Sequence, residues 1–168
     1  MRANGIDLQS RLNPPRAIHT AGFTLVELLI ALAVLAIVSS IALPIYSTFT
    51  DRANRSEAQS DLLMCAQGME RWASNNFDYL GAADTNGDGT GDANIGNPAA
   101  EVCTPRSVTA GRYTITINLA TATTFTLRAN PIGQMADDGF MTVNQAGLQA
   151  WDQNNNGTIG ANENTWHE

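Results

Sequence analysis

The sequence predicts an α+β fold in which a long N-terminal helix packs on an antiparallel β-meander. An apolar run begins at Phe23 and continues as an amphipathic pattern to about Asn75, and segments of alternating polarity follow from residue 113. With 168 residues, 43 % of them apolar and 15 % charged, the chain has room for one globular domain beside the apolar run. We therefore expect three parts: a leader at residues 1–22, a transmembrane helix at 23–49, and an exported globular domain at 50–168.

The apolar run is long enough to cross a membrane. Glu27 is the only charged residue between Phe23 and Phe49. A helix that rises about 1.5 Å per residue needs roughly 20 mainly apolar residues to span a bilayer core. The three arginines in residues 1–22 then place the N-terminus in the cytoplasm by the positive-inside rule. We expect a single pass through the inner membrane, with the rest of the chain exported.

Glu27 allows two interpretations. In the first, Thr24 and Glu27 form a capping box, in which the carboxylate binds backbone N–H groups at the start of the helix. In the second, a lone carboxylate inside an apolar helix bundle needs a partner of opposite charge. The second interpretation predicts that Glu27 acts in assembly.

The heptapeptide from Gly22 to Leu28, GFTLVEL, resembles the processing site of type IV pilins and the related pseudopilins. This resemblance implies that a prepilin peptidase cuts after Gly22 and methylates the new N-terminal Phe23. The apolar segment would then become the central helix of a filament. Gly22, Phe23, Glu27 and Pro44 all fall where the family's motif expects them, and the amine of Phe23 in an adjacent subunit would be the partner of Glu27.

Pro44 lies inside the helical pattern, where its missing N–H and its ring are expected to kink or locally melt the helix without ending it. Beyond it, apolar residues recur at spacings of three and four and predict a stripe that packs against a sheet. The stripe consists of Ala58, Leu62, Cys65, Met69 and Trp72.

Alternating residues predict two strands at 113–119 and 125–129, joined by a short turn, and a third, weaker strand at 140–144. Residues 81–105 are rich in Gly, Asn, Asp, Ala and Pro, which predicts a long exposed connection. Residues 125–131, with Asp137-Asp138-Gly139 and the turn at 144–147, resemble the sheet of low-abundance minor pilins.

Cys65 lies on the predicted helix and Cys103 in the predicted connection. Both are expected on the exported side, where an even pair of cysteines is most simply a disulfide. Closing a loop of this length would stabilise the fold by roughly 4 kcal/mol in the chain-entropy model. The alternative is two separate thiols.

Two loops rich in oxygen ligands resemble calcium-binding loops of the EF-hand type. The second loop, residues 152–163, satisfies the pattern D-x-N-x-N-G-x5-E, so a weak Ca²⁺ site is expected there, with Gly160 acting through a water. Its predicted ligands are Asp152, Asn154, Asn156, Thr158 and Glu163. The first loop offers Asp84, Asn86, Asp88 and Asp92 but has Ile95 at the closing position. The alternative for both is an ordinary Asn/Gly turn.

The charge excludes a generic nucleic-acid binder, since 16 acidic residues outweigh nine basic ones, all of them arginine. Catalysis is not expected either. His19 belongs to the leader and His167 is the penultimate residue, so the sequence provides no Ser/His/Asp set.

These observations favour a minor pilin that enters the type IV pilus or primes its assembly, and thereby supports twitching motility, adhesion or DNA uptake. Its expected partners are other pilin subunits, bound through the N-terminal helix, the prepilin peptidase, and the inner membrane before assembly into the extracellular pilus. One alternative is a pseudopilin of a type II secretion system. The other is a calcium-binding envelope domain that stays anchored by its helix.

Overall fold

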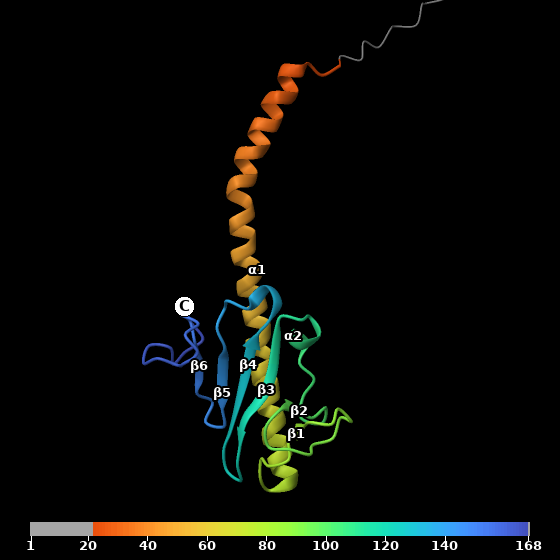
Figure 1. The fold of residues 1–168 in the computed structure, drawn as a ribbon, viewed down its shortest axis with the longest axis vertical. Coiled ribbons are helices and arrows are strands. Elements are labelled where there is room, and N and C mark those ends of the chain that lie inside the picture. Colours follow the sequence, from red (N-terminus) through yellow and green to blue (C-terminus); the bar gives the residue numbers. More distant parts are fainter. Residues whose placement is uncertain (1–21, 168) are drawn as a thin grey trace, which may run out of the picture. The chain divides into compact units, whose positions relative to one another are not determined.

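The computed structural model describes residues 22–167, so the predicted leader, apart from Gly22, lies outside the described residues. Its elements run in the order α1 (Leu25–Asn76), β1 (Ala83–Asp84), β2 (Asn97–Pro98), α2 (Arg106–Thr109), β3 (Tyr113–Ala120), β4 (Phe125–Pro131), η1 (Gly133–Met135), β5 (Met141–Asn144) and β6 (Gln149–Trp151) (Figure 1). Contacts within the chain divide it into two compact units, residues 1–43 and 44–168.

The helix α1 continues through Pro44 and ends at Asn76, close to the predicted end. The carbonyl of Pro44 accepts hydrogen bonds from the hydroxyls of Ser47 at 2.9 Å and Thr48 at 3.0 Å. These side chains supply donors just beyond the position where the proline ring removes a backbone donor. The prediction that Pro44 does not end the helix is confirmed, but the helix is not locally melted there, because the α-helical backbone is continuous through Pro44.

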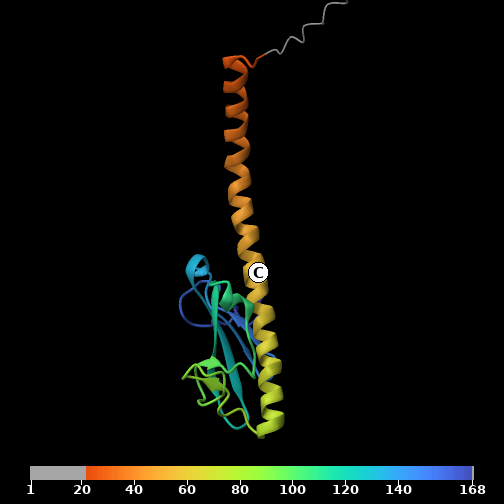
Figure 2. The same ribbon diagram turned by 90° about the vertical axis from the view of Figure 1, so that its right-hand side faces the viewer.

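The main sheet is an antiparallel meander with the strand order β3-β4-β5-β6. Thr116 pairs with Arg128, Arg128 with Thr142, and Thr142 with Ala150, so one row of residues crosses all four strands. The register of β3 against β4 shifts once, between Ile117 and Leu119. Within residues 44–168, the sheet lies along the second part of α1 (Figure 2). The predicted α+β class, a long N-terminal helix packed on an antiparallel meander, is confirmed.

The core joins one face of α1 to one face of this sheet. The helix contributes Ala58, Leu62, Cys65 and Met69, each 0 % exposed, as the predicted stripe requires. The alternating residues of β3, β4 and β5 supply the opposite wall. Gly68 lets the backbone at Val102 come close, since a Cβ added to it would lie 2.0 Å from the Val102 carbonyl oxygen.

The connection at 81–105 is more ordered than the composition indicates. It forms the two-stranded sheet β1-β2, and its small apolar residues Ala82, Ala83 and Ala99 are 0 % exposed. The sequence prediction also lacked α2 and β6. Asp61 of α1 holds α2 in place, because its carboxylate accepts a 2.7 Å hydrogen bond from the backbone N–H of Ser107.

Candidate functional site

The first part of α1 exposes an unusual amount of apolar surface. From Leu25 to Leu43 the large apolar side chains are 54–75 % exposed, and Phe23 is 85 % exposed. Length and composition would allow this stretch to cross a membrane. Apolar surface on this scale marks a place where lipid or another protein is expected to bind.

Glu27 lies in the first turn of this helix. Its backbone N–H donates to the hydroxyl of Thr24 at 3.2 Å, which is one half of the predicted capping box. The returning hydrogen bond, from the Thr24 N–H to the Glu27 carboxylate, is not formed in the described structure. The carboxylate is therefore available to a partner outside the chain.

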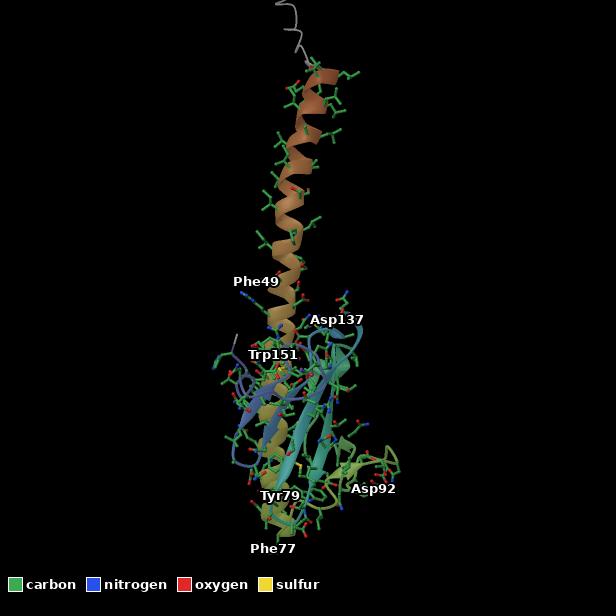
Figure 3. All side chains as sticks on the ribbon, turned by 60° about the vertical axis from the view of Figure 1, so that its left-hand side comes forward. Phe49, Phe77, Tyr79, Asp92, Asp137 and Trp151 are labelled. Carbon is green, nitrogen blue, oxygen red and sulfur yellow. A yellow bond between two sulfur atoms is a disulfide. The ribbon has the colours of Figure 1, made fainter. Side chains whose placement is uncertain are left out.

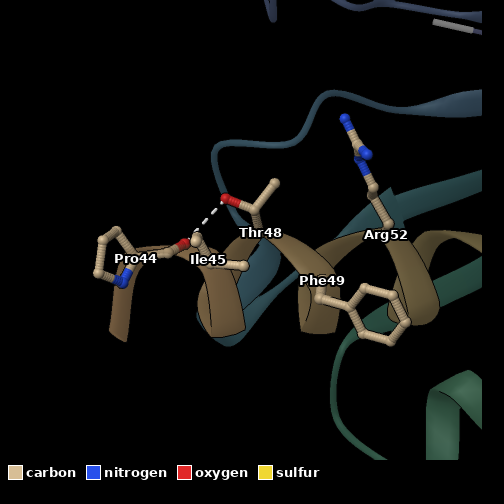
Figure 4. A pocket seen from close by; sticks show the side chains of 5 residues that line it. All are labelled: Pro44, Ile45, Thr48, Phe49 and Arg52. Carbon is tan, nitrogen blue, oxygen red and sulfur yellow. Dashed lines mark hydrogen bonds between the residues drawn. The ribbon is translucent and has the colours of Figure 1, made fainter. Parts of the chain in front are cut away.

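A shallow groove of about 360 Å³ follows Pro44 on the surface of α1 (Figure 4). Its lining consists of Pro44, Ile45, Thr48, Phe49 and Arg52. The Thr48 hydroxyl turns back to the carbonyl of Pro44, so the groove presents mainly apolar groups. Phe49, 74 % exposed, continues the apolar surface toward the globular unit.

The predicted disulfide is present. Cys65 on α1 and Cys103 in the connection are bonded, and their Cα atoms lie 5.1 Å apart. Both sulfur-bearing side chains are buried, and they lie near the contact between Gly68 and Val102. The bond therefore fixes the connection to the helix at a point where the two backbones are already close.

The loop at 152–163 is folded around its two carboxylates. Asp152 is 0 % exposed and accepts the N–H groups of Asn156 at 3.0 Å and Gly157 at 2.8 Å. Glu163 is 6 % exposed and accepts the N–H of Gly160 at 2.6 Å. Gly157 has a φ of 86°, a left-handed conformation that glycine adopts readily and that lets the loop bend sharply.

The remaining predicted ligands of this loop lie near its surface. The side-chain oxygen of Asn154 accepts the N–H of Asn156 at 3.0 Å, and that of Asn156 accepts the N–H of Thr158 at 2.9 Å. The N–H of Trp151 donates to the carbonyl of Glu163 at 2.9 Å, which joins the two ends of the loop. The sequence predicts the loop but not the complete burial of Asp152.

The loop that begins at Asp84 repeats much of this geometry. The carboxylate of Asp84 accepts the N–H of Gly89 at 2.9 Å, five residues on, just as Asp152 accepts that of Gly157. Gly89 also has a positive φ, 92°. The closing position differs, because Ile95 is 59 % exposed and Asp92 instead accepts the N–H of Thr85 at 2.9 Å.

The two loops differ in their number of carboxylates, because residues 152–163 contain Asp152 and Glu163, whereas residues 84–92 contain Asp84, Asp88 and Asp92. Within residues 22–167, no three His, Cys, Asp or Glu side chains come together in a way that could hold a metal ion. A cation at the 152–163 loop would therefore depend on amide and carbonyl oxygens beside its two carboxylates.

A buried polar cluster that the sequence did not predict lies where the sheet meets α1. Asp138 accepts from Arg55 Nε at 3.0 Å and from the hydroxyl of Tyr113, and its carbonyl accepts from the Trp151 indole at 2.8 Å. The Arg55 guanidinium carbon lies 3.9 Å from the centre of the Trp151 ring. Burial, together with the Asp138 carboxylate, raises the pKa of Tyr113 well above its usual value of about 10.

Figure 3 labels Trp151 of this cluster together with several other side chains. Trp151 and Asp137, the neighbour of Asp138, lie near the part of α1 that enters the globular unit. Phe77 marks the opposite end of that part of the helix, and Asp92 projects from the first Asp/Asn loop. The sequence pattern around Arg55 or around Asp138 does not reveal their ion pair, because the two residues are 83 positions apart.

Two family models match the chain. Residues 44–139 match the model described as "Type IV minor pilin ComP, DNA uptake sequence receptor", and residues 19–43 match the prokaryotic N-terminal methylation motif. The second match covers Gly22 and Phe23, where cleavage and methylation are predicted. Together the two models extend over the apolar helix and most of the globular unit.

Individual relatives are more distant. The type IV major pilin protein PilE1 of Neisseria gonorrhoeae is 28 % identical over 139 residues, which cover 82 % of this chain and 55 % of PilE1. The chain thus spans about half the length of this relative. The crystal structure of the Neisseria meningitidis non-core minor pilin PilV shares 18 % identity, with a TM-score of 0.44, and the match covers 71 % of this chain and 98 % of PilV.

The ComP model alone covers more than half of the chain, and the methylation motif adjoins it directly at Pro44. The chain therefore belongs to the ComP family of type IV minor pilins.

Proposed function

We propose that this minor pilin is cleaved after Gly22 and enters the type IV pilus through residues 23–49. The observation that carries the proposal is the exposure of the apolar side chains over this stretch. Each fully buried leucine gains about 1.5–3 kcal/mol relative to water, so the surface is stable only in lipid or against other subunits. The inner membrane covers it before assembly, and the equivalent helices of neighbouring subunits cover it afterwards.

Glu27 sets the register of that assembly. Its carboxylate lacks the returning capping bond, and cleavage after Gly22 creates a positively charged amine on Phe23. Glu27 of one subunit pairs with the Phe23 amine of the next, because a carboxylate buried among helices without a partner is strongly unfavourable. N-methylation keeps a basic amine at this position.

Incorporation into pili tests this role. Sheared, detergent-washed pili from strains with Glu27→Val should contain far less of the chain than wild-type pili, measured by quantitative mass spectrometry with equal cellular expression. Glu101→Val, at an exposed acidic residue of the connection, is the matched control and should be incorporated normally. Equal incorporation of both variants would refute the role of Glu27 and favour simple helix capping.

We propose DNA uptake as the process that this subunit supports, since the matching family model is described as a DNA uptake sequence receptor. After Pro44 the chain has six arginines and fourteen acidic residues, so any direct contact with DNA is confined to a local patch. Arg106 on α2 is exposed and is a suitable centre for such a patch.

Transformation separates this process from motility and adhesion. Deletion of the gene should lower DNA uptake more than twitching or attachment. Arg106→Gln should lower uptake with normal pilus incorporation if DNA contacts this face. If the deletion strain takes up DNA as efficiently as the wild type, the proposal is overturned. A defect only in twitching would assign the subunit to motility.

We also propose that the 152–163 loop binds Ca²⁺ weakly. Two buried carboxylates lie in one loop, and burying such charges is favourable only when they are neutralised or well bonded. Asp152, Asn154, Asn156, Glu163 and the carbonyl of Thr158 would hold the ion, with a water at Gly160. With only two charged ligands, the dissociation constant should be of the order of 10⁻⁴ to 10⁻³ M.

Calcium would act on the C-terminus, because this loop leads to Trp166, which is 7 % exposed and whose carbonyl accepts from Gln59 of α1. Millimolar calcium should raise the Tm of the mature protein relative to chelator and change its tryptophan fluorescence. Glu163→Gln should remove both responses, and Glu101→Gln should keep them. If the Tm is the same in calcium and in chelator, the loop does not bind calcium and is an ordinary Asn/Gly turn.

A further inference from the structure

A cavity of about 560 Å³ lies against the sheet where β5 and β6 meet the C-terminal segment. Its volume falls within the range of about 300–1,000 Å³ that is typical of small-molecule sites. Thr126, Thr142 and Asn144 reach it from the sheet face that points away from α1, because their strand neighbours form the core. Ile159 and Asn164 line it from the C-terminal segment, and the cavity remains open to solvent.

The lining of this cavity carries no charge. Five of the eight lining residues have a hydroxyl or an amide, and three are aliphatic. The polar group consists of Thr126, Thr142, Asn144, Gln149 and Asn164, and the aliphatic group of Leu148, Ala150 and Ile159. Hydroxyls and amides both donate and accept hydrogen bonds, so the lining suits a ligand whose groups also do both.

Part of this hydrogen-bonding capacity is unused by the protein itself. In residues 22–167 the hydroxyls of Thr126 and Thr142 have no side-chain or backbone partner. Asn144 accepts the N–H groups of Ala146 and Leu148 at 3.0 Å, which leaves its NH₂ group available as a donor. A ligand could therefore meet at least two hydroxyls and one amide.

The same chemistry excludes several ligand classes. A phosphate or nucleic acid needs cationic groups, and a metal ion needs carboxylates, neither of which lines the cavity. Arg128 pairs with Thr142 across the strands, but its guanidinium lies 3.6 Å above the centre of the Phe140 ring. The arginine is thus engaged beside the cavity rather than in its lining.

We propose that this cavity binds a short neutral oligosaccharide. Sugar hydroxyls match the threonine hydroxyls and side-chain amides, while the C–H faces of the sugar rings match Leu148, Ala150 and Ile159. The site goes beyond filament assembly and DNA uptake, and neither of those roles requires it. It would let the subunit attach to a glycan-bearing surface.

The test uses the mature full-length protein in a zwitterionic detergent, because detergents with sugar headgroups would compete. Maltotriose, cellotriose and triacetylchitotriose are titrated and followed by saturation-transfer NMR. At least one of the three should bind. Thr126→Val with Thr142→Val removes both hydroxyls at nearly constant shape and should weaken that binding roughly tenfold, since each hydrogen bond contributes about 0.5–1.5 kcal/mol.

Thr116→Val is the matched control, because Thr116 lies on the same face of the sheet but outside the cavity lining. It should leave binding unchanged, and all variants should still unfold in one cooperative transition. The proposal is overturned if none of the three sugars binds, or if the double variant binds as tightly as the control. It is also overturned if inorganic phosphate or an unstructured peptide binds more tightly than the sugars and loses this binding in the double variant. Pilus incorporation is measured separately, so failure here leaves the assembly role intact.

Discussion

The two parts of α1 present apolar side chains to different surroundings. Between Leu25 and Leu43 these side chains are 54–75 % exposed, whereas Ala58, Leu62 and Cys65 further along the same helix are fully buried. The second part is covered by the sheet of its own chain. The first part has no such cover within residues 22–167, so its apolar surface requires lipid or other subunits. One helix thus provides both core contacts and an exposed apolar surface, and the following substitutions test this division.

The largest expected effect concerns the polar cluster that ties the second part of α1 to the sheet. Asp138→Ala removes the carboxylate that pairs with Arg55, whose side chain is 13 % exposed, and it also removes the partner of the Tyr113 hydroxyl. Breaking a buried pair in this way should lower the free energy of unfolding by about 3–5 kcal/mol. Chemical denaturation of the mature protein measures the change. The exposed neighbour Asp137 is the control, since Asp137→Ala should change stability by less than about 0.5 kcal/mol.

A pair of leucines compares the two parts of the helix directly. Leu62→Ala removes a fully buried side chain and should cost about 2–5 kcal/mol of stability. Leu35→Ala, at a residue that is 63 % exposed, should leave the unfolding of the globular unit unchanged but reduce incorporation into pili. If both variants lose similar amounts of stability, the proposal that only the second part of α1 stabilises the globular unit is wrong.

The disulfide fixes the connection to the second part of α1, so its removal should lower the stability of the globular unit and loosen the connection most. We expect Cys65→Ala with Cys103→Ala to lose about 2–4 kcal/mol of stability, because the bond closes a span of 38 residues. Denaturation of the double variant measures the loss, and hydrogen exchange should rise between residues 81 and 105. Unchanged exchange there would mean that β1-β2 and the small buried residues hold the connection without the bond.

The smallest expected effect is a gain at the end of the helix. Phe77 has a φ of 67° and is 93 % exposed, so an aromatic residue occupies a left-handed position that favours glycine. Phe77→Gly should raise stability by about 0.5 kcal/mol, measured by thermal melting. Phe77→Ala removes the ring but keeps the Cβ, and should bring no gain. A gain in the alanine variant would assign the effect to the exposed ring instead of the backbone.

Much of this architecture follows from periodicity and composition. The helix, β3, β4 and β5 are visible because each repeats its apolar residues with a single period, and the two cysteines could form only one disulfide. The strand β6 and the helix α2 are three and four residues long, too short to establish a period. Both are held by long-range contacts, such as the hydrogen bond from Ser107 to Asp61.

In the candidate site too, the sequence predicts features that lie within one segment and misses those that distant segments form together. Glu27 and the two Asp/Asn loops were predicted because their spacing within one segment carries the information. The Arg55–Asp138–Tyr113 cluster and the uncharged cavity were not, since their members come from distant segments that only the folded sheet brings together. The sequence also could not show that Asp152 is fully buried, because burial depends on how the loop closes on the sheet.

The central claim is that neighbouring subunits cover residues 23–49 in the filament. The most direct measurement replaces Leu35 with the photo-crosslinking amino acid p-benzoylphenylalanine and irradiates sheared pili after detergent washing has removed the membrane. Position 35 should crosslink to the apolar helices of other pilin subunits, and the same label at the exposed Phe77 serves as the comparison. If the detergent removes the chain from the pili, or position 35 crosslinks only to lipid, the account is contradicted.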